Sequence, residues 1–274
     1  MSGQALKDDP ALSLKVGGHS VGENLQKAVD EGRIVANDDG TLELAKRDPP
    51  AEDYYIGHAG EFKKPCRFLN AFLFQNAYAQ SAVPFGCRHC YKVKIVPGNL
   101  RQLMAVKEII ETTPYTAKSG VEAEAQRNQH IYGSYIYNLG LDRARAAYKD
   151  LRDRINAHAL LGPNVKMLIK RGCTNYEHSC GPSDRYTFDS RLEAVEAYLA
   201  NRFRNASSRQ SALSNAVADR IRLIRMIGAA FRLGDDTYKD FTGGKALFRP
   251  VVTYSPDPED GEREDRSPDA TAHS

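Results

Sequence analysis

Four segments in the middle of the chain have the residue pattern of β-strands. Each either alternates apolar and polar residues or is rich in aromatic and β-branched residues, as half-buried strands are. These segments are residues 91–96, 115–122, 131–137 and 165–170. Apolar residues at helical spacing predict one helix over 99–112, between the first two strands, and another that begins at Asp142, between the last two.

The resulting order of strand, helix, strand, strand, helix, strand is that of the split βαβ arrangement. We therefore expect an α+β fold with a ferredoxin-like β-α-β-β-α-β core, in which one antiparallel sheet carries two helices on one face. In this topology the first and fourth strands are antiparallel neighbours. The start of the first strand therefore lies beside the end of the fourth.

The segment before this core has local signals of its own. Ser20 followed by Glu23 is a capping-box pattern and predicts a helix over 21–31. Residues 33–36 and 41–44 flank a turn and predict a small hairpin. Ser20 also stands in a G-x-S-x-G sequence typical of hydrolase nucleophiles, but a helix cap explains it better because its hydroxyl can accept a backbone N–H.

Helical signals dominate the rest of the chain. Apolar residues four apart predict a buried helix over 65–81. Ser190 and Glu193 form a second capping-box pattern, and a longer amphipathic helix is predicted over 208–233. Residues 247–252 contain a proline and predict an edge strand.

These patterns divide the chain into four parts. We expect an N-terminal arm with a short helix and a hairpin, a cysteine-rich basic α+β core, a helical extension, and an acidic tail that is disordered. Their predicted limits are 1–55, 56–187, 188–254 and 255–274.

Composition narrows the class of protein. Of the 274 residues, 41% are hydrophobic and 27% are charged, which is ordinary for a globular chain. No stretch approaches the roughly 20 apolar residues that a membrane-spanning helix needs, and the first residues lack the pattern of a secretory signal. Five cysteines, an odd number, do not make a disulfide scaffold. We expect a soluble cytoplasmic protein with no membrane partner.

Charge is unevenly distributed along the chain. Residues 88–171 hold 15 Lys or Arg against 7 Asp or Glu, whereas residues 255–274 hold 2 Arg against 7 acidic residues. A basic core favours an anionic partner, either a nucleic acid or an acidic protein. The alternative is that these cations only solvate exposed faces. The predicted contact residues are Lys92, Lys94, Arg143, Arg145, Arg152 and Arg154.

Four cysteines flank the first and fourth predicted strands. Cys87 and Cys90 form a C-x-x-C pair directly before the first strand, and Cys173 and Cys180 follow the fourth. Because those strand ends are expected to meet, the sulfurs are expected to share one corner of the sheet. Four thiolates suit tetrahedral zinc or, as an alternative, an iron–sulfur cluster. Two other interpretations stay open: buried thiols without metal, and a redox-active pair.

Two functions follow from these patterns. The first is a metal-stabilised protein whose basic core binds an anionic partner. The second is an enzyme that uses an iron–sulfur cluster or reactive thiolates at the same corner, with His89, His178, Glu177 and Asp184 available for proton transfer. His89 or His178 could also replace one sulfur as a metal ligand. Tyrosines along 131–137 raise a further possibility, since aligned aromatic side chains on a sheet can stack nucleic-acid bases.

Overall fold

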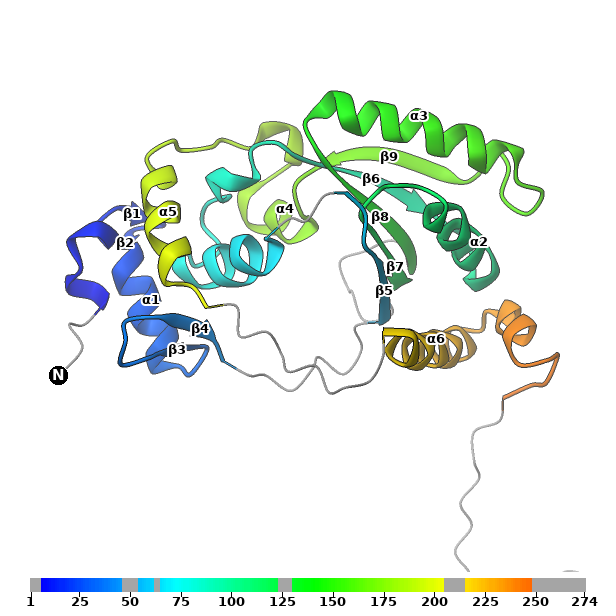
Figure 1. Cartoon of the computed structure of the whole chain (residues 1–274), viewed down its shortest axis with the longest axis horizontal. Helices are drawn as coiled ribbons and strands as arrows, with labels where there is room; N and C mark the ends of the chain where they lie inside the picture. Colours follow the sequence, from blue (N-terminus) through cyan, green and yellow to red (C-terminus); the bar gives the residue numbers. More distant parts are fainter. Residues whose placement is uncertain (1–5, 46–53, 62–64, 123–129, 205–214, 248–274) are drawn as a thin grey trace, which may run out of the picture.

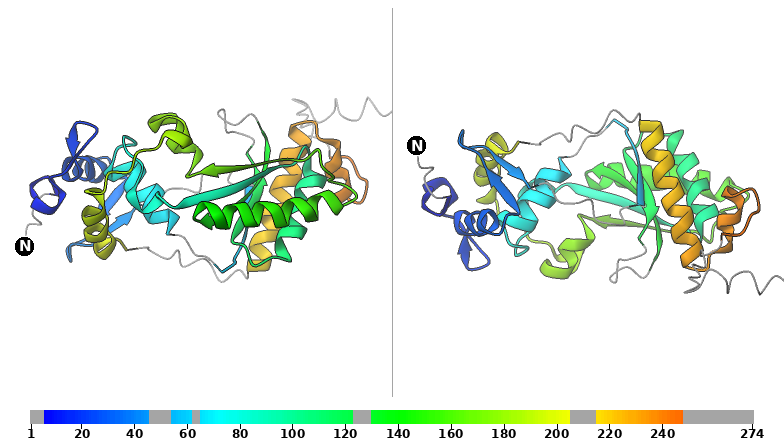
Figure 2. Two further views of the ribbon diagram at one scale, coloured as in Figure 1. Left: turned by 90° about the horizontal axis from the view of Figure 1, so that it is seen from above. Right: turned by 90° about the horizontal axis from the view of Figure 1, so that it is seen from below.

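The computed structural model describes residues 6–45, 54–61, 65–122, 130–204 and 215–247. Over these residues the chain is a mixed α/β protein with antiparallel sheets. Figures 1 and 2 show an elongated molecule, with the main sheet and helices α2, α3 and α6 at one end and the N-terminal elements at the other.

The main sheet has five strands in the order β5-β7-β8-β6-β9, and every neighbouring pair is antiparallel. The strands are β5 (Tyr54–His58), β6 (Cys90–Val96), β7 (Ala117–Val121), β8 (Tyr132–Leu139) and β9 (Lys166–Arg171). The four predicted strands correspond to β6, β7, β8 and β9. The first and fourth are antiparallel neighbours as expected, with Tyr91 opposite Arg171. The fifth strand, β5, was not predicted from the sequence.

Three helices cover one face of this sheet: α2 (Leu100–Glu111), α3 (Leu141–Ala157) and α6 (Asn215–Arg232). Helices α2 and α3 match the predicted pair. The apolar core beneath them includes Val93, Ile95, Ile136, Val106 and Leu151, all buried. A second cluster joins α6 to β5 and α2 through Tyr54, Ile56, Leu103, Met226 and Ala229.

The N-terminal part contains the predicted helix and hairpin, together with four short elements that the sequence analysis does not predict. In chain order, its elements are η1 (Leu6–Asp8), η2 (Pro10–Leu12), β1 (Lys15–Val16), β2 (His19–Ser20), α1 (Val21–Asp30), β3 (Ile34–Ala36) and β4 (Leu42–Leu44). The hairpin β3–β4 is confirmed. The capping box of α1 is also confirmed, because the Ser20 hydroxyl accepts the Glu23 N–H at 3.0 Å and the Glu23 carboxylate accepts the Ser20 N–H at 2.6 Å.

The capping box gives a first prediction. Ser20→Ala should lower the free energy of unfolding by about 1 kcal/mol, because an N–H of the first turn of α1 loses its acceptor. Urea unfolding followed by circular dichroism measures the change. Ser20→Asp is the matched control, since it keeps a capping oxygen and should stay close to the parent protein. An unchanged Ser20→Ala variant would contradict the capping role.

Of five further elements, two precede β6 in the sequence and three follow β9. They are the π-helix η3 (Arg67–Ala77), η4 (Phe85–Cys87), α4 (Thr174–Cys180), η5 (Ser183–Arg185) and α5 (Leu192–Arg202). One large apolar cluster unites α1, η3, α4 and α5, with Leu25, Phe72, Tyr176 and Leu199 fully buried in it. The second predicted capping box is wrong. Helix α5 begins at Leu192 and has no side-chain cap.

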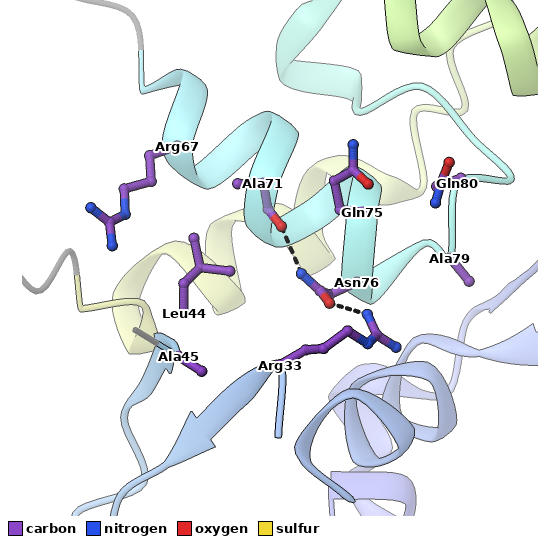
Figure 3. A pocket seen from close by; sticks show the side chains of 9 residues that line it. All are labelled: Arg33, Leu44, Ala45, Arg67, Ala71, Gln75, Asn76, Ala79 and Gln80. Atoms are coloured by element: carbon purple, nitrogen blue, oxygen red, sulfur yellow. Dashed lines mark hydrogen bonds between the residues drawn. The ribbon is translucent and has the colours of Figure 1, made fainter. Parts of the chain in front are cut away.

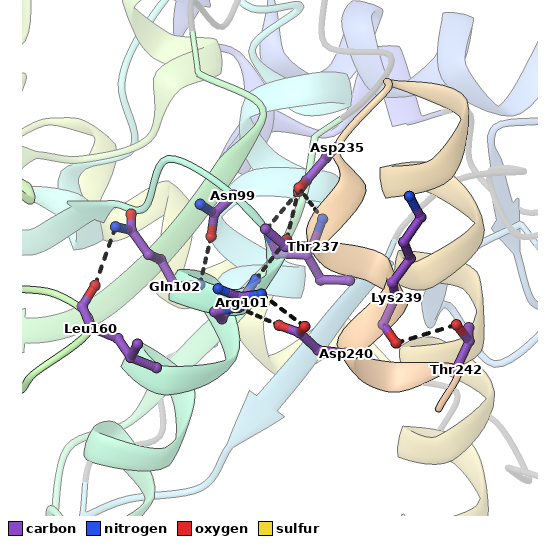
Figure 4. Close-up of polar contacts among 10 residues, drawn as sticks. Asn99, Arg101, Gln102, Leu160, Asp235, Thr237, Lys239, Asp240 and Thr242 are labelled. Carbon is purple, nitrogen blue, oxygen red and sulfur yellow. Dashed lines mark hydrogen bonds and ion pairs between the residues drawn. The ribbon is translucent and has the colours of Figure 1, made fainter. Parts of the chain in front are cut away.

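The last described element forms hydrogen bonds with the N-terminus of α2. In η6 (Asp236–Phe241) and the residue before it, polar side chains meet the α2 N-terminus (Figure 4). Asp235 accepts the Leu100 N–H at 2.7 Å, and the Thr237 hydroxyl accepts the Arg101 N–H at 3.2 Å. These two contacts satisfy backbone donors that a helix start leaves without intrahelical partners. The Arg101 guanidinium also donates through Nε and Nη2 to the two carboxylate oxygens of Asp240.

Some sequence predictions fall on other parts of the chain. Residues 248–274, which include most of the predicted edge strand and the acidic tail, lie outside the described residues, as does the start of the helix predicted over 208–233. Where the structure describes the chain, it contains no helix both long and apolar enough to cross a bilayer.

Candidate functional site

The face of the main sheet opposite α2, α3 and α6 carries lysines and tyrosines. Successive residues of a strand point to opposite faces, so the neighbours of the buried Val93, Ile95 and Ile136 point away from the helices. We call this surface the lysine–tyrosine face. Its members are Tyr55, Lys92, Lys94, Lys118, Tyr135, Tyr137, Lys166 and Lys170.

Strand register places ammonium groups over aromatic rings on this face. Lys92 lies opposite Tyr137, with Nζ 5.1 Å from the ring centroid. Lys94 and Lys118 both lie opposite Tyr135, and each Nζ is 5.4 Å from that ring. Lys118 Nζ is also 3.6 Å from the centroid of Tyr55. Lysine and tyrosine therefore alternate across four neighbouring strands in favourable cation–π geometry.

One carboxylate, that of Glu122, accepts hydrogen bonds from two of the three tyrosines on this face. The hydroxyls of Tyr55 and Tyr135 both donate to Glu122 Oε1, the latter at 2.7 Å. Glu122 Oε2 is buried and has no hydrogen-bond partner among the described residues. Burial, and after it the Glu122 carboxylate, raises the pKa of Tyr135, which therefore stays a neutral hydroxyl donor.

Positive charge is crowded on this face. Lys92 and Lys94 are each only 8% exposed, Lys118 and Lys170 are half-buried, and Lys166 is exposed. Burial lowers the pKa of Lys94; Glu122 opposes this, whereas the charges of Lys170 and Lys166 lower it further. An anion placed here would relieve this repulsion.

Other elements cover the end of the lysine–tyrosine face where β6 begins and β9 ends, next to Cys90 and Cys173. The ammonium of Lys170 bonds to Thr174 Oγ1 at 3.1 Å and to the Glu177 carboxylate, both on α4. Helix η5 also packs against β9. Among the described residues, the more accessible part of the lysine–tyrosine face is therefore the part away from α4, which holds the exposed Lys166 and the half-buried Lys118.

The six predicted contact residues do not form one surface. Lys92 and Lys94 lie on the lysine–tyrosine face, whereas the four arginines lie on α3, which covers the other face. Three of these arginines have local partners: Arg145 pairs with Asp142, Arg154 pairs with Asp150, and Arg152 donates to the Val165 carbonyl oxygen at 2.8 Å. Arg143 is exposed.

The structure brings the four predicted metal ligands into one region. Gly172 N–H donates to the Cys90 carbonyl oxygen at 2.9 Å, so the first and fourth strand ends meet as expected. Cys87 and Cys90 are buried in the N-terminal apolar cluster, and Cys173 and Cys180 pack against it. The fifth cysteine, Cys66, is half-buried directly before η3.

The sulfur atoms have different neighbours. Cys87 Sγ lies 3.4 Å from the Tyr176 hydroxyl, Cys173 Sγ accepts a hydrogen bond from Lys92 Nζ at 3.1 Å, and Cys180 Sγ lies 3.7 Å from the Gln80 carbonyl oxygen.

Burial also acts on one of these thiols, because it raises the pKa of Cys180. Within the described ranges, no three His, Cys, Asp or Glu side chains are grouped as metal ligands. Zinc or an iron–sulfur cluster at Cys87, Cys90, Cys173 and Cys180 stays a prediction, and so does an enzyme built on this corner.

Lys92 is the unusual group at this corner. Burial lowers its pKa, but the charges of Cys173, Tyr137 and Cys90 outweigh that effect and raise it above the ordinary value. Lys92 therefore stays a buried ammonium whose closest polar contact is a sulfur atom.

Sequence reasoning missed four members of the lysine–tyrosine face, namely Tyr55, Lys118, Lys166 and Lys170, and it also missed Glu122, which binds two of the tyrosines. The alternation of β9 contained a usable signal, because its apolar Met167 and Ile169 imply that Lys166, Leu168 and Lys170 point the other way. Tyr55 had no such signal, since its strand was not predicted.

The comparisons with known proteins give no family. No protein-family model, no curated protein and no solved structure matches this chain.

Proposed function

We propose that this protein binds single-stranded nucleic acid on the lysine–tyrosine face. The observation that carries the proposal is the alternation of lysine ammonium groups and tyrosine rings across β5, β7, β8 and β6, on the sheet face away from the helices. Lysines attract the phosphates, and aromatic rings stack bases in a way that tolerates any sequence.

We further infer that β6 to β9, with α2 and α3, form a ferredoxin-like unit to which β5 is added at one edge. The strand order β7-β8-β6-β9 and the antiparallel pairing of all four strands support this assignment. RNA-recognition modules have a four-stranded sheet of this kind and stack bases on aromatic residues of its strands. The lysine–tyrosine face has the corresponding position.

The tyrosines favour single strands over duplexes. Bases in a duplex are stacked on each other and cannot reach rings set between lysines, whereas an unpaired base can reach the half-buried ring of Tyr55. Tyr135, beside Tyr55, is only 5% exposed and supports that ring from below. Lys118 and Lys166, in the more accessible part of the face, are the proposed phosphate contacts. The buried Lys92 and Lys94 add to the positive potential.

Fluorescence anisotropy with a labelled single-stranded RNA of mixed sequence tests the proposal. Lys118→Ala/Lys166→Ala should weaken binding roughly tenfold, and each substitution should reduce the slope of log affinity against log salt by about 1. Arg143→Ala/Arg145→Ala, on the opposite face, is the matched control and should bind like the parent protein.

Three outcomes would overturn the proposal. The first is equal binding by the parent and the lysine variant at the same thermal stability. The second is a loss of binding in the arginine variant alone, which would place the partner on α3. The third is equal or tighter binding of the duplex of the same sequence, which would exclude base stacking as the basis of recognition.

A further inference from the structure

A polar cavity, separate from the lysine–tyrosine face, lies between the N-terminal hairpin and the π-helix η3 (Figure 3). Its volume is about 640 Å³, within the range of small-molecule sites. Arg33 enters it from the chain before β3, and Arg67 from the start of η3. Leu44 and Ala45 line it from the end of the hairpin.

The lining of this cavity is cationic and rich in hydrogen-bond groups. Among the described residues, the charged lining residues are Arg33 and Arg67, and the amides of Gln75, Asn76 and Gln80 complete the polar lining. No carboxylate of the described residues lines the cavity, although Glu31, outside the lining, pairs with Arg33 at 2.7 Å. Two guanidinium groups at one cavity favour a ligand with negatively charged oxygens.

One of the arginines is held in position. Arg33 donates to Asn76 Oδ1, and the Asn76 amide in turn donates to the Ala71 carbonyl oxygen at 2.7 Å. Asn76 is only 6% exposed. The Arg33 guanidinium is therefore oriented before any ligand arrives, which reduces the entropy lost on binding. Arg67 is exposed and has no ion pair among the described residues.

The backbone around the cavity is unusual. The helix that forms one wall, η3, has π geometry over 11 residues, and π segments are rare and frequent at functional sites. It is followed by Ala79 and Gln80, whose φ values are +44° and +62°. They are the two non-glycine residues with positive φ in the described ranges, and both line the cavity. Such conformations cluster at ligand sites.

We propose that this cavity binds a small oxyanion, a molecule that carries a phosphate or a carboxylate group and further hydrogen-bonding atoms. Arg33 and Arg67 bind the charged oxygens, and the amides of Gln75 and Gln80 bind the polar remainder. This site is separate from the nucleic-acid site proposed above and does not depend on it.

Isothermal titration calorimetry tests the site with two probes, pyrophosphate and citrate, at constant ionic strength. We expect saturable binding of at least one probe; tighter binding of pyrophosphate would identify a phosphate ligand and tighter binding of citrate a carboxylate ligand. Arg67→Gln should weaken binding roughly tenfold, because it removes charge-assisted hydrogen bonds from an exposed side chain without disturbing the core.

Three further variants separate this site from other causes. Arg33→Lys keeps the charge but loses the planar fork, and should also weaken binding. Arg143→Gln, an exposed arginine on α3, should bind the probe like the parent protein. Lys118→Ala/Lys166→Ala should also leave probe binding unchanged, which distinguishes this cavity from the lysine–tyrosine face.

The proposal is overturned if neither probe binds saturably. It is also overturned if Arg67→Gln binds as tightly as the parent, or if only the lysine variant loses binding.

Discussion

Replacing Glu196 by alanine is expected to lower the free energy of unfolding by about 3 to 5 kcal/mol. Glu196 lies on α5, is 7% exposed and accepts three hydrogen bonds. Its donors are the Tyr78 hydroxyl at 3.0 Å, the Phe85 N–H at 2.6 Å and the Gly86 N–H at 2.8 Å. Alanine would leave the buried Tyr78 hydroxyl and the N–H groups of the half-buried Phe85 and the exposed Gly86 without this acceptor, and α5 would lose its polar connection to the segment before β6.

Urea unfolding of the parent and two variants measures this effect. Glu196→Gln keeps one acceptor oxygen but turns an N–H toward a donor, so it should fall between the parent and Glu196→Ala. Glu193→Ala, at a largely exposed carboxylate on the same helix, is the matched control and should change stability by less than about 0.5 kcal/mol. Equal stability of the Glu196→Ala and Glu193→Ala variants would contradict the structure.

Glu196 also has a pH signature. Burial raises its pKa above the ordinary value of a glutamate, although the hydrogen bonds from Gly86, Phe85 and Tyr78 oppose the rise. Because the folded-state pKa is above the unfolded one, the proton stabilises the folded state below the unfolded pKa, and this contribution is lost as pH rises through the folded pKa. As pH rises above the ordinary pKa of a glutamate, about 4.3, the parent should therefore lose stability relative to Glu196→Gln.

The second large effect concerns the hydrogen bond between the buried Lys92 and the half-buried Cys173. Cys173→Ala should lower the free energy of unfolding by about 3 kcal/mol or more, because it removes the sulfur that accepts the hydrogen bond from the buried ammonium group of Lys92. Lys92→Met removes that ammonium and fills a similar volume, so it should change stability little. The double variant Lys92→Met/Cys173→Ala should recover most of the loss caused by Cys173→Ala, and chemical denaturation of all four proteins measures this cycle.

The same cycle tests the predicted metal. If Cys87, Cys90, Cys173 and Cys180 held a structural zinc ion, Cys173→Ala would release the metal, and Lys92→Met could not restore stability. Zinc and iron contents of each variant, measured by mass spectrometry on protein purified without oxygen, separate the two cases. Rescue without bound metal supports the lysine–sulfur pair. Metal in the parent together with no rescue supports the four-cysteine site.

Local patterns in the sequence determined most individual elements. The strand and helix order from β6 to β9, the β3–β4 hairpin and the Ser20 cap all depend on residues a few positions apart, and each could be inferred from spacing. The capping box predicted from Ser190 and Glu193 is wrong because a neighbouring residue, Asp189, binds the backbone at this position. The Asp189 side chain accepts the Arg191 N–H at 3.0 Å, and the helix begins two residues after Ser190.

Tertiary packing decided how those elements combine into sites. The sequence indicated a basic core but assigned Lys92, Lys94 and the α3 arginines to one contact surface, whereas the sheet separates them onto opposite faces. Arg33 and Arg67 are distant in sequence and line one cavity only because the hairpin packs beside η3. Spacing along a chain fixes which side of an element a residue occupies. What that side faces depends on contacts between distant segments, for which a single sequence has no local signal.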